Sequence, residues 1–130
     1  RKPAVAKKVR VVSSQFITRD ITSTGFADCV FGYAVLGEVL EHLDKPESAV
    51  KEAFRILKPG GILAISVPFD EAREFGAVDA TRHVWSFDKQ DIINLIKPYS
   101  ARIEFTVLGS RWFPRYRYCF PQLICWATKR

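Results

Sequence analysis

The sequence has 130 residues, a length that fits one domain around a single hydrophobic core. Its 48% hydrophobic and 26% charged residues are typical of a folded soluble domain and argue against disorder, low-complexity tracts and collagen-like repeats. No apolar run approaches the roughly 20 residues of a membrane-spanning helix, and the three cysteines show no C-x-x-C spacing. We therefore expect a cytoplasmic protein without a disulfide framework or a cysteine-built zinc site.

The formal net charge of +6 is distributed unevenly along the chain. All 14 acidic residues lie between Asp20 and Glu104, whereas the two flanks hold eleven of the 20 basic residues. Basic ends of this kind favour a polyanionic partner such as nucleic acid. They are equally typical of the solvated ends of a domain cut from a longer protein, and a chain that opens at Arg1 without Met favours such a fragment.

Two stretches near the start of the chain predict β-strands. Val9–Val12 and Phe16–Ile21 are rich in β-branched residues, and we expect one strand that ends near Asp20. The stretch Phe26–Gly37 is almost continuously apolar and contains two glycines, which favours a central parallel strand buried on both faces.

A helix and another strand are predicted next. Asp44 is a candidate N-cap and Pro46 suits a first helical turn. Apolar residues then recur at helical spacing: Ala49, Val50, Ala53, Phe54 and Leu57. Lys58–Gly61 should end the helix, and Gly61–Val67 should form a second buried strand. Strand, helix and strand together predict a right-handed crossover unit.

The second half of the chain predicts a loop, a helix and two strands. Phe69–Arg82 is polar and without period, and long loops after a sheet strand are often functional. Ser86 or Asp88 can cap the helix that follows. Arg102–Leu108 and Gln122–Thr128 alternate between apolar and polar residues, which predicts an antiparallel pair at a sheet edge.

Three short motifs occur in a fixed order: E-V-L-E-H-L at Glu38–Leu43, R-I-L-K-P-G-G at Arg55–Gly61 and R-H-V-W-S-F at Arg82–Phe87. With this order and spacing, the sequence from about Asp20 to its end resembles the class I S-adenosylmethionine-dependent methyltransferases, in particular the type 11 and ubiquinone-biosynthesis-like group. The resemblance implies an α/β fold, a Rossmann-like doubly wound sheet truncated at its N-terminus and ending in an antiparallel strand pair. It implies one partial methyltransferase-like domain over residues 1–130.

The resemblance also implies S-adenosylmethionine as the cofactor, bound across the carboxyl ends of the strands. Asp20 matches the family's acid near the adenine amino group, with Ile21 beside the ring, and Glu38 and Val39 match positions that border the cofactor. The family's glycine-rich turn is absent, since no G-x-G-x-G occurs, and so is the acid that holds the ribose hydroxyls. Nine residues separate Asp28 from Glu38, more than is usual in the family.

Carboxylates and imidazoles gather in the same motifs. Glu38, Glu41 and His42 form an E-x-x-E-H cluster that could bind a divalent cation such as magnesium if His83 folds over the same strand ends. In related enzymes a similar cluster holds a substrate hydroxyl, whose pKa the cation lowers. The alternative is that Glu41 and His42 are packing residues at the start of a helix. His83 is also a candidate general base, or else a structural histidine.

Three arginines and five aromatic residues alternate between Arg111 and Phe120. Arg111, Trp112, Arg115 and Tyr116 are the candidate substrate-binding residues of this stretch, since they could stack on bases or hold an anionic or aromatic acceptor. The alternative is that the aromatic rings pack a long edge loop while the arginine stems lie along them.

Three classes of function are consistent with these patterns. The leading one is S-adenosylmethionine-dependent methyl transfer to a small-molecule or other nucleophilic acceptor. The second is a non-catalytic methyltransferase-like scaffold or partner subunit, because the glycine-rich turn is missing. In that case the apolar strand edge near Val30 would favour a homodimer or pairing with a missing N-terminal half. The third is a nucleic-acid-binding module that uses the basic ends and the stretch of arginines and aromatic residues between Arg111 and Phe120.

Overall fold

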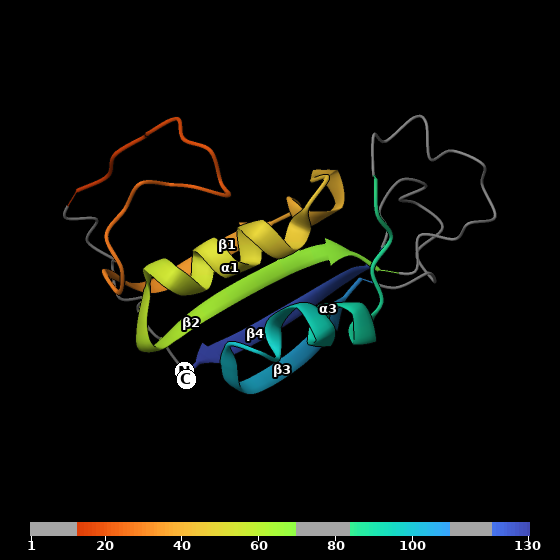
Figure 1. The fold of residues 1–130 in the computed structure, drawn as a ribbon. Helices are drawn as coiled ribbons and strands as arrows, with labels where there is room; N and C mark the ends of the chain where they lie inside the picture. The colour runs from red at the N-terminus through yellow and green to blue at the C-terminus, as the bar shows by residue number, and fades with distance from the viewer. Residues whose placement is uncertain (1–12, 70–83, 110–120) are drawn as a thin grey trace, which may run out of the picture.

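The computed structural model describes residues 13–69, 84–109 and 121–130. Its elements in chain order are β1 (Phe31–Gly37), a 3-10 turn η1 (Leu40–His42), α1 (Pro46–Ile56), β2 (Leu57–Pro68), α3 (Lys89–Ile96), β3 (Ser100–Leu108) and β4 (Gln122–Lys129). They form the α/β arrangement of Figure 1, with helices packed on one mixed sheet.

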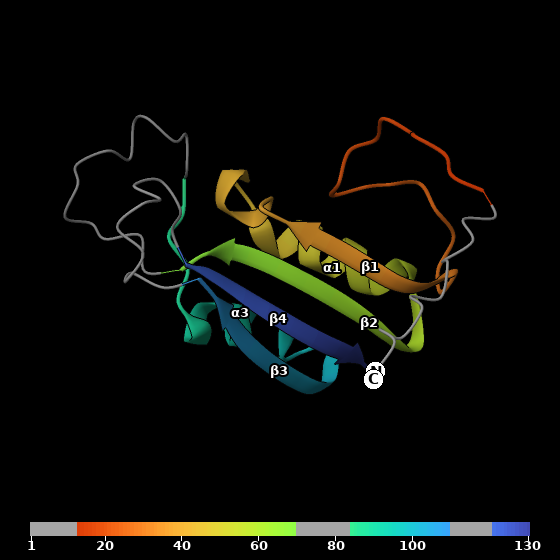
Figure 2. The ribbon, with the colours of Figure 1, turned by 180° about the vertical axis from the view of Figure 1, so that it is seen from behind.

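The four strands lie side by side in the order β1-β2-β4-β3. β1 and β2 are parallel and are joined through α1, which confirms the predicted crossover unit. β4 runs antiparallel to both β2 and β3, which confirms the antiparallel pair at the end of the chain. The fold class expected from the sequence, an α/β Rossmann-like sheet that ends in an antiparallel strand pair, is therefore present, with helices on one of its faces among the described residues (Figure 2).

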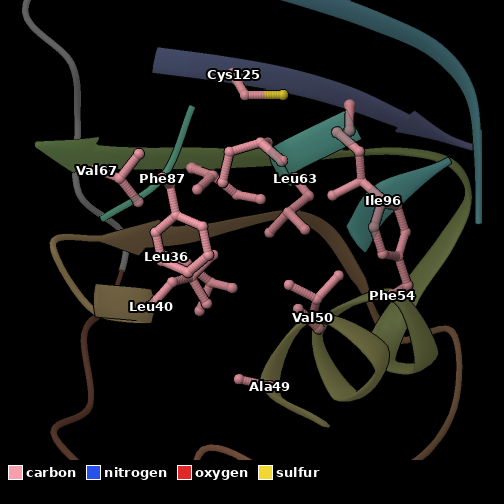
Figure 3. Packing of buried hydrophobic residues seen from close by; sticks show 14 of the residues in the cluster. Leu36, Leu40, Ala49, Val50, Phe54, Leu63, Val67, Phe87, Ile96 and Cys125 are labelled. Atoms are coloured by element: carbon pink, nitrogen blue, oxygen red, sulfur yellow. The ribbon is translucent and has the colours of Figure 1, made fainter. Parts of the chain in front are cut away.

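Both helices cover the same face of the sheet, α1 over β1 and β2, and α3 over β4 and β3. Because side chains alternate along a strand, Leu63, Ile65 and Val67 of β2 all point to this face and are buried. They meet Phe54 of α1 and Ile96 of α3 in one apolar cluster (Figure 3). This cluster joins the two halves of the described chain.

The ends of the helices are set by local chemistry. Pro46 occupies the first turn of α1 as predicted, but the N-cap is Lys45 and not Asp44. At α3 the structure selects Asp88 over Ser86. Its side chain accepts a hydrogen bond from the Asp91 N–H at 2.8 Å, and the Asp91 side chain accepts one from the Asp88 N–H at 3.0 Å. This reciprocal capping box fixes the start of α3.

Two predictions about the first third of the chain were wrong. No strand forms at Phe16–Ile21, because the Asp20 side chain accepts a hydrogen bond from the backbone N–H of Thr22 and so starts a turn there. The predicted central strand over Phe26–Gly37 is shorter, and β1 is an edge strand among the described elements. Its Tyr33 and Val35 are about three-quarters exposed, because no described helix covers that face.

Two expectations from composition can be compared with the described residues. None of the helices in these ranges is long and apolar enough to cross a membrane. Cys29 and Cys125 are both free thiols, the first exposed and the second buried. Burial raises the pKa of Cys125 to about 12, so this thiol stays protonated.

Candidate functional site

Three strand ends meet at one edge of the sheet. β1 and β2 are parallel, so their carboxyl ends lie together, and β4 starts beside them because it is antiparallel (Figure 1). Open α/β sheets bind ligands beyond the carboxyl ends of their parallel strands. Glu38, Pro68 and Gln122 therefore lie at the edge where a ligand is expected.

Glu38 follows β1 directly and has a left-handed backbone, with φ of 53°. A residue other than glycine is strained in this region, and such strain is concentrated at functional sites. Its N–H donates to the carbonyl oxygen of Ser66 at 3.0 Å, while its carboxylate Oε1 accepts from the Ser66 hydroxyl at 2.9 Å. Two contacts with β2 thus hold an exposed carboxylate at the strand ends.

Gln122, at the start of β4 on the far side of β2, reaches the same carboxylate. One orientation of the Gln122 amide gives both its oxygen and its nitrogen suitable partners. In that orientation the nitrogen lies 2.5 Å from Oε1 and 3.2 Å from Oε2 of Glu38. The same nitrogen donates to the carbonyl oxygen of Val67 at 3.1 Å. Sequence reasoning selected Glu38 but missed Ser66 and Gln122. The available signal was their position, one near the end of a predicted strand and the other at the start of one.

The turn η1 follows this carboxylate and buries Glu41, which is 1% exposed. Val39 is half-buried at its start. The Glu41 carbonyl oxygen accepts hydrogen bonds from the N–H groups of Val84 at 2.7 Å and Trp85 at 3.2 Å. The Trp85 indole N–H donates to the Leu43 carbonyl oxygen at 2.8 Å. These hydrogen bonds hold residues 84 and 85 against η1, which forms one end of the candidate site.

The predicted adenine-side residues Asp20 and Ile21 lie in a tight turn. Asp20 Oδ1 accepts from both the N–H and the hydroxyl of Thr22, at 2.8 and 2.7 Å, and the Ser23 N–H donates to the Asp20 carbonyl oxygen at 3.1 Å. The hydrogen bonds from Thr22 hold the pKa of Asp20 below its usual range. Ile21 is half-buried against the core. The turn therefore places a charged side chain and an apolar side chain next to each other.

The described part of the chain brings no three histidine, cysteine, aspartate or glutamate side chains together as metal ligands. Glu38 is held by Ser66, whereas Glu41 is buried and its Oε1 lies 3.9 Å from Nε2 of His42. His83, the fourth predicted ligand and the candidate base, lies outside the described residues. The metal site therefore stays a prediction from the sequence.

The predicted substrate residues Arg111, Trp112, Arg115 and Tyr116 also lie outside the described ranges, and their role stays a prediction. The same holds for the basic stretch before residue 13, on which the nucleic-acid hypothesis partly depends.

Comparison with known proteins agrees with this description. Residues 2–65 match the model of a family described as a methyltransferase domain. No curated protein matches the sequence.

Solved structures resemble the fold at low sequence identity. A methyltransferase from Thermotoga maritima superposes with a TM-score of 0.69 at 18% identity, over 88% of this chain and 63% of that one. The N-methyltransferase NodS from Bradyrhizobium japonicum, in complex with S-adenosylhomocysteine, gives 0.61 at 18% identity, over 85% and 52%. A Haloferax volcanii methyltransferase, in complex with the Trm112 activator, gives 0.64 at 16% identity, over 88% and 62%. The chain thus spans between 52% and 63% of the length of these three structures.

Proposed function

We propose, from the premise that this chain belongs to the class I S-adenosylmethionine-dependent methyltransferases, that it acts in methyl transfer to a small-molecule or other nucleophilic acceptor. The observation that carries the proposal is the strained Glu38, whose carboxylate is fixed by Ser66 and Gln122 at the sheet edge where this fold class binds ligands. The proposed setting is the cytoplasm.

The residues divide between the two ends of the cofactor. Asp20 and Ile21 would take the adenine, since the carboxylate can accept from its amino group and the aliphatic side chain can lie against its ring. Glu38 and Val39 would border the part of the cofactor nearer the sulfonium. We thus assign these four residues to the adenine side and the strand-end side of the cofactor, whereas the glycine-rich turn has no counterpart in the sequence.

Bound S-adenosylmethionine would supply an electrophilic methyl group to an acceptor lone pair in line with the S–CH₃ bond, and S-adenosylhomocysteine would be the leaving group. A protonated acceptor must also lose a proton. His83 is the predicted base, and the Glu38 carboxylate is a second candidate because it lies exposed at the strand ends. Arg111, Trp112, Arg115 and Tyr116 are the proposed contacts to the acceptor.

Calorimetric titration of the 130-residue chain tests this function directly. We expect S-adenosylmethionine and S-adenosylhomocysteine to bind with Kd values in the micromolar range, whereas adenosine triphosphate, which shares the adenosine but lacks the amino-acid part, should bind much more weakly. We expect magnesium to leave these Kd values unchanged, because Ser66 and Gln122 already engage the Glu38 carboxylate.

The absence of binding to either sulfur ligand would contradict the enzyme proposal for this chain. Tighter binding with magnesium would instead support a cation held by Glu38, Glu41, His42 and His83.

A second candidate is a partner subunit, and the uncovered sheet face favours it. Tyr33 and Val35 of β1 lie on the same face as Trp126 of β4, and all three are exposed in the described structure. Apolar side chains beside an edge strand favour pairing with another chain, and we propose a second copy of this one. The Haloferax neighbour, which is held in a complex with an activator, is a precedent for association.

We expect sedimentation velocity at micromolar concentration to give the mass of a dimer, and Val35→Lys to convert it to a monomer because a charge would be buried in the interface. Thr106→Lys on β3, an exposed position on the same sheet face, is the matched control and should leave the mass unchanged. A monomer for the unmodified chain would contradict this second proposal.

A further inference from the structure

The loop before β1 is attached to α1 through one buried carboxylate. Glu52 is 7% exposed, and its Oε1 accepts hydrogen bonds from the N–H and the hydroxyl of Thr24 at 2.8 and 2.6 Å. Arg55, one turn further along α1, donates from Nε to Oε2 and from its terminal nitrogen to Oε1, both at 2.7 Å. Four donors therefore converge on a single carboxylate.

Arg55 extends this contact to the far end of the loop. Its guanidinium also donates to the carboxylate of Asp28. The next two backbone N–H groups, of Cys29 and Val30, donate to the carbonyl oxygens of Arg55 and Ile56 at 3.1 and 2.9 Å. These bonds satisfy carbonyls that the end of a helix would otherwise leave unpaired. The loop is thus held to α1 at Thr24 and again at its junction with β1.

The charged forms of Glu52 and Arg55 stabilise each other. Hydrogen bonds from Arg55, and then from Thr24, lower the pKa of Glu52 to about 2 against the opposing effect of burial. The same bond with Glu52, together with the bond to Asp28, raises the pKa of Arg55. Both groups therefore stay charged throughout the neutral range. An apolar side chain at position 52 would pack there at a lower desolvation cost, but it could not bind the N–H of Thr24.

The segment just before the first attachment point, Thr24, is closed on itself. Arg19 donates to the Thr24 carbonyl oxygen at 2.6 Å, and its guanidinium lies 4.9 Å from the ring centre of Phe26. The Asp20 turn lies directly between Arg19 and Thr24. Thr24 therefore helps to hold Asp20 and Ile21 in place, and Glu52 in turn holds Thr24.

We propose that Glu52 is a positioning residue for ligand binding: through Thr24 it holds the turn of Asp20 and Ile21 where that turn can take an adenine ring. This inference rests on the proposed function. Glu52 touches no cofactor, so its effect should be confined to the adenine end of the ligand.

The test compares Glu52→Ala with Thr24→Val, which removes only the hydroxyl donor, and with Glu47→Ala, an exposed glutamate in the first turn of the same helix. Calorimetry gives the Kd of S-adenosylhomocysteine and of adenosine, and hydrogen exchange reports on residues 19–30. We expect Glu52→Ala to raise both Kd values by the same factor, about 10-fold, and to speed exchange in 19–30 while β2 and β4 keep their protection. Thr24→Val should raise both Kd values by about 3-fold, and Glu47→Ala should leave both unchanged.

Three results would overturn the inference. In the first, hydrogen exchange in residues 19–30 speeds up in Glu52→Ala while the Kd values stay unchanged, so the hydrogen bonds of Glu52 serve only the stability of this segment. In the second, the Kd of S-adenosylhomocysteine rises while that of adenosine does not, so Glu52 acts elsewhere. In the third, Glu52→Ala unfolds and the folded Thr24→Val binds like the unmodified chain. If the unmodified chain binds neither ligand, the proposed function fails first and the positioning role falls with it, which calorimetry on that chain alone reveals.

Discussion

Replacing Gly61 by alanine is expected to lower the free energy of unfolding by about 2–3 kcal/mol, a large share of the stability of a small domain. A Cβ at this position would lie 2.8 Å from the carbonyl oxygen of Lys58 and 3.1 Å from that of Gly32. Both neighbours are backbone atoms, so they cannot rotate away as a side chain would. The change forces apart β1 and β2 at the bulge where their register shifts.

Urea denaturation followed by circular dichroism measures this effect, and Gly32→Ala is its matched control. Gly32 lies in the neighbouring strand, and a Cβ there would meet no atom within 4 Å. We therefore expect Gly32→Ala to change the free energy of unfolding by less than about 1 kcal/mol. Equal stabilities for the two variants would show that β1 and β2 do not approach closely at this point.

The sequence patterns that predicted the fold correctly are those that repeat over several turns or pairs. Ala49, Val50, Ala53 and Phe54 recur at helical spacing, and all four are buried in α1. The alternation over Gln122–Thr128 likewise matches β4, whose Leu123, Cys125 and Ala127 face the helices and are buried. Such periods report which face of an element is buried, and the core follows from them.

The first third of the chain shows where this reasoning fails. Phe16–Ile21 has the composition of a strand, yet Phe16 is fully exposed and Asp20 starts a turn. The hydrogen bonds that Thr22 donates to the Asp20 side chain outweigh a weak β-propensity, because that propensity depends on a neighbouring strand. No such neighbour is present among the described residues at that position.

The candidate site was predictable only in part, for a related reason. A motif selected Glu38, but its partners Ser66 and Gln122 come from two other strands and have no sequence link to it. In the sequence, Glu52 likewise has no feature that separates it from other helix glutamates, and only its contact with Thr24 in the structure shows its role. Three-dimensional pairing of residues far apart in the chain decides which polar groups are held in place.

The strain at Glu38 gives the second large effect, one that should separate stability from binding. Glycine adopts a left-handed backbone without strain, so Glu38→Gly should recover about 1 kcal/mol and offset the lost hydrogen bonds of an exposed carboxylate. We expect an unchanged or slightly higher melting temperature. The Kd of S-adenosylhomocysteine should nevertheless rise about 10- to 100-fold, because a charge-assisted hydrogen bond is worth about 1.5–3 kcal/mol.

Cys29→Gly is the matched control for this variant, because Cys29 has the same kind of backbone, with φ of 57°, at the other end of β1. Relief of strain there should raise the melting temperature and leave the Kd of S-adenosylhomocysteine unchanged. If both variants bind the ligand equally well, the left-handed backbone at Glu38 serves only to turn the chain out of β1. If Glu38→Gly alone loses affinity while staying folded, the strain at Glu38 is maintained to present its carboxylate to the ligand.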